Sequence, residues 1–138
     1  MLEWIRRFDL RKAGLCSVAV GGVTIMLHIL VISGVIPYLW VNGGRTGSYA
    51  EAQQISMISI ILTIINIGIA LIASRIIPVK MNRFWGIVLS AFLIITLPLS
   101  FVGVLQQFLG TTFEKCVTSV ITIIGFIADT RIAFEKRW

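Results

Sequence analysis

Hydrophobic residues dominate long stretches of this chain, and charged residues do not interrupt them. No Asp, Glu, Lys or Arg occurs in three intervals, Ala13 to Gly44, Ala52 to Ser74 and Phe84 to Phe113. Each interval is longer than the roughly 20 residues that cross a bilayer as a helix. The pattern therefore predicts membrane-spanning segments and not the core of a water-soluble domain.

Four transmembrane helices are predicted around the apolar centres, at residues 14–36, 55–77, 84–105 and 113–134. Strands of a membrane barrel need only about 10 residues each and alternate in polarity, whereas these runs are longer and apolar on nearly every side. A helix also satisfies its own backbone groups, for which lipid offers no partner. We expect an all-α integral membrane protein, a single domain over residues 1–138, with the helices in an antiparallel up-down bundle.

The fourth segment differs from the others because its uncharged centre is short, from Cys116 to Ala128. A re-entrant or interfacial segment is one interpretation, and a full crossing is the other. We favour the crossing because Glu114 and Lys115 can lie in one headgroup layer while Arg131 extends toward the other. Residues 1–12 alternate apolar and charged positions, which predicts a short amphipathic helix on the membrane surface.

Composition and charge agree with a membrane protein and give it a direction. Of the 138 residues, 57% are hydrophobic and 13% are charged, against roughly 25% charged in a soluble domain. With the N-terminus in the cytoplasm, all of the 12 lysines and arginines except Arg45 and Lys115 fall on the cytoplasmic side. This positive-inside bias predicts that both termini are cytoplasmic, in a plasma membrane or a bacterial inner membrane.

The net charge of +6 also bears on partners. The basic residues are divided among short segments, so we do not expect nucleic-acid binding. Membrane lipids are the expected partners, because basic residues at the cytoplasmic face match anionic headgroups. A homo-oligomer or a partner membrane protein is compatible with the same sequence.

Small and polar residues recur three and four positions apart in every predicted span, so each set lies along one helix face. Close packing of helices is the ordinary interpretation of such stripes, and a polar seam that binds a ligand is the alternative. The sets are Gly14, Ser17, Gly21, Thr24 and His28; Ser56, Ser59, Thr63, Asn66, Ala70 and Ala73; Thr96, Ser100, Gly103 and Gln107; and Thr118, Thr122, Gly125 and Asp129.

Three residues of these stripes, His28, Asn66 and Asp129, are too polar to act only as spacers. His28 and Asn66 are predicted at depths that differ by roughly 4 to 5 Å, so they can bond each other directly or through a shared ligand. For Asp129 an ion pair with Arg75 or Lys12 is the ordinary explanation, and a functional role is the alternative. The candidate seam consists of His28, Asn66, Thr24, Thr63, Ser100, Thr122 and Asp129.

No catalytic motif is present, and no cofactor or metal is expected. The single histidine has no second histidine or interior cysteine at metal-ligand spacing, and HExxH is absent. Cys16 and Cys116 are predicted at opposite faces of the membrane, too far apart for a disulfide. The glycine-rich segment 43–47 lacks the Lys-Ser or Lys-Thr of a phosphate loop and is interpreted as a flexible turn.

Two functions of different classes therefore fit the sequence, and an enzymatic function is the least favoured. The first is a small polytopic membrane protein that binds or translocates a lipid-like or small ligand through a polar seam between its helices. The second is a non-catalytic accessory, regulatory or immunity-type protein that acts by helix contacts with a partner membrane protein.

Overall fold

The computed structural model describes residues 2–137, and helices make up most of this range. The helices are α1 (Leu2–Arg6), α2 (Leu10–Ile32), α3 (Tyr49–Ala73), α4 (Arg83–Leu109) and α5 (Ser119–Ala133). Two 3-10 turns, η1 (Tyr38–Trp40) and η2 (Asn42–Gly44), follow α2, and a π-helical turn, η3 (Glu114–Thr118), continues into α5. Four segments are long and apolar enough to cross a membrane. They are α2, α3, α4 and the segment Glu114–Ala133, which consists of η3 and α5. The prediction of an all-helical protein with four candidate transmembrane helices is confirmed.

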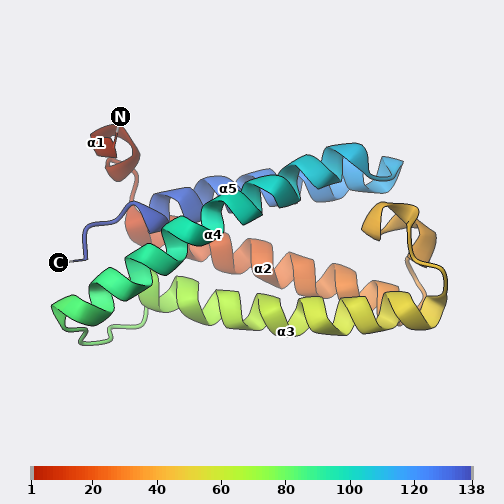
Figure 1. Cartoon of the computed structure of the whole chain (residues 1–138), viewed down its shortest axis with the longest axis horizontal. Helices are drawn as coiled ribbons and strands as arrows, with labels where there is room; N and C mark the ends of the chain where they lie inside the picture. Colours follow the sequence, from red (N-terminus) through yellow and green to blue (C-terminus); the bar gives the residue numbers. More distant parts are fainter. Residues whose placement is uncertain (1, 138) are drawn as a thin grey trace.

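The long helices pack in a chain of neighbours. Helix α2 packs against both α3 and α5, and α4 packs against α5. Figure 1 shows α4 starting beside the end of α3 and then diverging from it toward the beginning of α5. Both ends of the described chain lie at the same end of the long helices, and η1 and η2 lie at the opposite end (Figure 1).

Helix α2 begins earlier than the predicted span because a side chain caps it. The Asp9 carboxylate accepts a hydrogen bond of 2.9 Å from the Lys12 backbone N–H, so the helix starts at Leu10. The same bond holds the pKa of Asp9 below its usual value. The expected surface helix over residues 1–12 is therefore divided. Helix α1 ends at Arg6, the last residues of the interval belong to α2, and residue 1 lies outside the described range.

Both α2 and α3 end sooner than residues 36 and 77, because a residue with left-handed backbone follows each of them. Gly34, with φ 76°, closes α2 at Ile32, and its N–H donates to the Val31 carbonyl at 3.1 Å. Arg75, with φ 60°, closes α3 in the same way. Glycine adopts this conformation without steric cost, whereas an arginine pays about 1 kcal/mol or more.

The fourth span has a buried charged residue at each end, Glu114 and Arg131. We had expected these side chains to lie in the headgroup layers. Glu114 is 6% exposed, and its carboxylate accepts hydrogen bonds from the backbone N–H groups of Gly43 at 3.0 Å and Thr111 at 2.8 Å. These hydrogen bonds attach the glycine-rich turn to the start of η3. Arg131 is 7% exposed and donates to the Phe8 carbonyl at 2.6 Å. These partners are available inside the protein, so neither side chain has to extend to the headgroups.

The C-terminal tail packs back onto the helix ends. Arg137 donates to the Ser90 hydroxyl at 3.1 Å and to the Ala73 carbonyl at 3.2 Å, so it joins α4 to α3. Burial lowers the pKa of Arg137 to about 10, which leaves the guanidinium charged at neutral pH. Carbonyls at the end of a helix carry partial negative charge, which favours a cation there.

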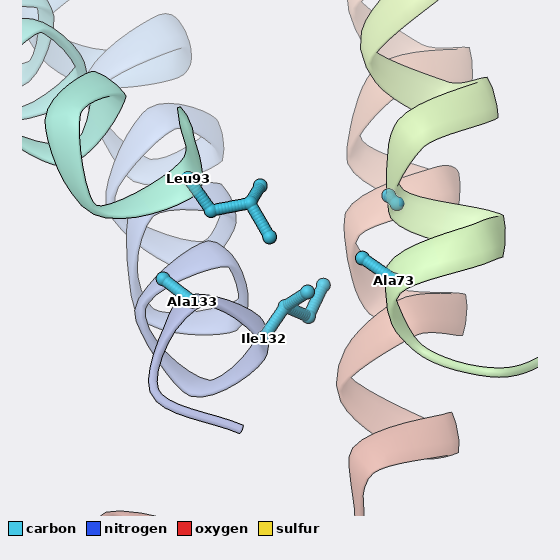
Figure 2. Close-up of a cluster of buried hydrophobic side chains, with 5 residues drawn as sticks. Ala73, Leu93, Ile132 and Ala133 are labelled. Atoms are coloured by element: carbon cyan, nitrogen blue, oxygen red, sulfur yellow. The ribbon is translucent and has the colours of Figure 1, made fainter. Parts of the chain in front are cut away.

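The buried apolar core is small and rich in alanine. One cluster joins Ala70 and Ala73 of α3 with Leu93 of α4 and with Ile132 and Ala133 of α5. Figure 2 shows Leu93 and Ile132 pointing toward α3 and Ala73 pointing back at them. Small residues let membrane helices approach closely, so dispersion contacts replace the hydrophobic effect that lipid removes.

Glycines on α2 permit its close approach to α3. A Cβ atom added at Gly14 would lie 2.1 Å from the Ser74 Oγ, and one added at Gly21 would lie 2.7 Å from the Ile67 Cγ1. Both glycines are buried. The packing interpretation of the α2 stripe is confirmed at these positions.

We expect Gly14→Ala to lower the free energy of unfolding by about 1 to 3 kcal/mol, because the added methyl group overpacks a tight contact. Ser74 is fully buried, and its hydroxyl donates to the Ala70 carbonyl at 2.6 Å, so a shift of this side chain costs a hydrogen bond. Gly22→Ala is the matched control on the same helix, since nothing lies within 4 Å of its added Cβ. The midpoint of thermal unfolding in detergent measures the stability of the two variants. Equal midpoints for Gly14→Ala and Gly22→Ala would contradict the close approach of α2 to α3.

Candidate functional site

A cavity of about 160 Å³ lies between α3, α4 and α5. Three of its polar residues belong to the predicted seam, and each comes from a different helix: Asn66 from α3, Ser100 from α4 and Asp129 from α5. Thr96 of α4 also lines it. The remaining lining residues are apolar: Ala70, Phe92, Leu93, Leu97 and Ile132.

The hydroxyl groups of Thr96 and Ser100 on α4 donate hydrogen bonds to carbonyls of their own helix. Thr96 donates to the Leu93 carbonyl at 2.9 Å, and Ser100 donates to the Thr96 carbonyl at 3.2 Å. Pro98 lies between them inside the helix and cannot donate to the carbonyl of residue 94. Each hydroxyl has one proton and two acceptor positions, so both keep acceptor capacity beside the cavity.

Asp129 is positioned from the opposite side by α2. Its Oδ1 accepts a hydrogen bond of 2.7 Å from the Ser17 hydroxyl, and Ser17 is 6% exposed. The expected ion pair with Arg75 or Lys12 does not form among residues 2–137: Arg75 pairs with Glu135 at 3.7 Å instead. A carboxyl group therefore lines the cavity without a cationic neighbour from the described chain.

Asn66 completes the polar lining and is itself exposed. No hydrogen bond joins its side chain to any other residue in the described range. An amide in a membrane span needs a partner, because lipid provides none. The α3 side of the cavity thus has both donor and acceptor capacity to offer.

His28 forms a hydrogen bond with Ser56 and not with Asn66, the partner that we considered from the sequence. Its Nδ1 lies 3.2 Å from the Ser56 Oγ, and Ser56 is fully buried. The contacts of α2 with α3 run toward this pair: Gly14 meets Ser74 and Gly21 meets Ile67. His28 lies about two turns beyond Gly21 on α2, and Ser56 lies about three turns beyond Ile67 on α3. Ser56 belongs to the predicted α3 stripe. A correct alignment of α3 against α2 would have identified it as the partner of His28.

The three remaining threonines of the predicted seam lie outside the cavity. Thr24 donates to the Val20 carbonyl at 2.9 Å, Thr63 to the Ser59 carbonyl at 2.7 Å and Thr122 to the Ser119 carbonyl at 3.0 Å. The structure therefore brings together Asn66, Ser100 and Asp129, and separates His28 and these threonines from them. Thr96, a stripe residue that we did not select, joins the first group.

No protein-family model, curated protein or solved structure matches this chain. The four candidate membrane spans indicate the class of protein, a multi-pass helical membrane protein. Any function must therefore be inferred from the geometry of its own residues.

Double-mutant cycles test the pairing of His28. We expect His28→Ala and Ser56→Ala to be coupled by about 0.6 kcal/mol in unfolding free energy, the average for hydrogen bonds between membrane helices. His28→Ala and Asn66→Ala should add within about 0.3 to 0.5 kcal/mol, as independent sites do. Coupling of His28 to Asn66 and not to Ser56 would refute the register of α2 on α3.

Proposed function

We propose that this membrane protein binds or translocates a lipid-like or small ligand, whose polar group enters the cavity between α3, α4 and α5. The observation that carries the proposal is the convergence of Asn66, Ser100 and Asp129 from three helices on one cavity. Polar residues inside spans are costly, and those that face a cavity commonly mark substrate pathways.

The lining favours a ligand group that donates hydrogen bonds. The two α4 hydroxyls keep only acceptor positions free, and Asp129 contributes a carboxyl group that already accepts from Ser17. A primary amine or a hydroxyl group supplies the donors that this set can accept. An acceptor-only carboxylate fits this lining less well, because only the Asn66 amide can donate to it and the Asp129 carboxyl group lies in the same cavity.

The volume limits which part of the ligand enters. Sites for drug-sized molecules measure about 300 to 1,000 Å³, so a cavity of about 160 Å³ holds only a small polar group. The exposed Asn66 lies at the border between this cavity and the surroundings of the spans. An apolar tail attached to the polar group can therefore stay in the bilayer.

We further propose an antiparallel bundle with both termini in the cytoplasm, in a plasma membrane or a bacterial inner membrane. The positive-inside bias supports this direction. Contacts at one end of the helices support a common side for the two termini, since Arg6 donates to the Phe134 carbonyl at 2.9 Å and Arg131 to the Phe8 carbonyl at 2.6 Å. At the opposite end of the helices, Glu114 accepts a hydrogen bond from the Gly43 N–H. This contact supports a common side of the membrane for the loop after α2 and the start of η3.

The binding proposal predicts selectivity between two amphiphiles with the same tail. We expect the purified protein to bind dodecylamine in detergent, measured by titration calorimetry, and to bind dodecanoate at least about fivefold more weakly. Asn66→Ala and Asp129→Ala should each weaken dodecylamine binding about fivefold, which corresponds to a lost hydrogen bond of about 1 kcal/mol.

Thr63→Ala and Thr122→Ala are the matched controls. They lie on the same helices, α3 and α5, but their hydroxyl groups bond within the helix and do not line the cavity. The proposal fails if all four variants bind dodecylamine alike, or if Asn66→Ala and Asp129→Ala lower the unfolding midpoint without weakening binding.

The accessory function is the second candidate, and the exposed Asn66 favours it. A polar side chain of a partner helix can satisfy an asparagine in a membrane span, and such bonds promote helix association. In that case the protein copurifies in mild detergent with a stoichiometric foreign subunit, Asn66→Leu releases it, and dodecylamine does not bind.

A further inference from the structure

A second and larger cavity, of about 630 Å³, lies between α1, α2 and α5. It does not share a lining residue with the cavity described above. Trp4, Ile5 and Phe8 form one side, Cys16 lies on α2, and Ile127 lies on α5. The volume falls in the range of about 300 to 1,000 Å³ that is typical of small-molecule sites.

Hydrogen bonds between the N-terminal segment and the end of α5 fix one side of this cavity. Arg131 donates to the Phe8 carbonyl at 2.6 Å and to the Arg6 carbonyl at 3.3 Å, and Arg6 donates to the Phe134 carbonyl at 2.9 Å. The segment after α1 is thus attached to the end of α5. The N-terminal aromatic residues are thereby held over α2 and α5 without closing on them.

The walls are apolar, and the charged residues lie toward the ends of the helices. Lys12 and Arg131 are the basic residues that line the cavity, and Asp9 is the acidic one. Arg131 is already paired with Glu135 at 2.8 Å, so Lys12 is the lining cation that has no ion pair among residues 2–137. The Asp9 carboxylate is engaged as the N-cap of α2. Arg7 and Arg11 flank this segment and are exposed. Basic residues therefore outnumber acidic ones around the opening.

We propose that this cavity binds one anionic phospholipid, with an acyl chain between α1, α2 and α5 and the phosphate beside Lys12. The charge around the opening is complementary to an anionic headgroup. The first candidate span begins at Leu10, which places the cavity where headgroups meet hydrocarbon. In that layer a phospholipid offers both an apolar chain and a negative charge, as this lining requires. The proposal depends on the membrane location and not on the ligand of the other cavity.

Native mass spectrometry in detergent tests the site with two lipids that carry the same acyl chains, phosphatidylglycerol and phosphatidylcholine. We expect the wild-type protein to retain one phosphatidylglycerol about fivefold or more in preference to phosphatidylcholine. Lys12→Gln should reduce that preference about fivefold, the effect of one basic residue near anionic headgroups. Lys115→Gln is the matched control, because Lys115 lies in η3 at the other end of α5 and is exposed.

A second pair of variants tests the acyl-chain position. Cys16→Phe fills the cavity with a ring and should reduce retention of phosphatidylglycerol about fivefold or more. Cys116→Phe places the same ring at an exposed position outside the cavity and should leave retention unchanged. If Cys16→Phe fails to fold, the comparison of Lys12→Gln with Lys115→Gln decides alone.

Three results would overturn the proposal. The first is equal retention of the two lipids by the wild-type protein. The second is an equal loss of phosphatidylglycerol in Lys12→Gln and Lys115→Gln. The third is a protein dimer that Cys16→Phe dissociates whether or not lipid is present, because a second copy of the chain would then occupy the cavity.

Discussion

One constraint shapes this protein: the hydrocarbon of a bilayer supplies no hydrogen-bond partner. Many hydroxyl groups in the spans meet it locally by donating to a carbonyl of their own helix, as Thr24, Thr63 and Thr130 do. Few polar groups are left to link one helix to the next. Close packing must therefore hold the helices together, which is why glycines occur where α2 approaches α3.

The same constraint explains the ends of the spans. Arg131 and Arg137 donate to backbone carbonyls at one end, and Glu114 accepts from backbone N–H groups at the other. Each charge thus satisfies backbone groups that a helix terminus or a loop leaves unpaired. The cavity between α3, α4 and α5 differs from these ends, since the exposed Asn66 side chain there has no hydrogen-bond partner in the described chain. The polar residues that converge on this cavity from three helices are the reason to infer a ligand.

The candidate site was predictable only in part. Helical spacing identified Asn66, Ser100 and Asp129 as polar residues on helix faces, and the structure brings them together. Spacing did not show that His28 faces Ser56. The sequence indicates the depth of a residue only from the centre of its apolar run, and that centre differs from the centre of the helix, whose ends are set by capping residues. Asp9 starts α2 about one turn earlier than its apolar centre indicates, and Gly34 ends it about one turn sooner. That displacement changes which residues of α2 and α3 meet.

By itself, the sequence determined the class of protein, because the length and apolarity of a span are properties of one segment and need no partner. The tertiary structure alone decided which polar residues share a cavity, which charges are buried and where α1 lies. These outcomes depend on contacts between residues far apart in the chain, such as Arg131 with Phe8 and Ser17 with Asp129. A periodic pattern shows which face of a helix is polar, but only packing shows what that face meets.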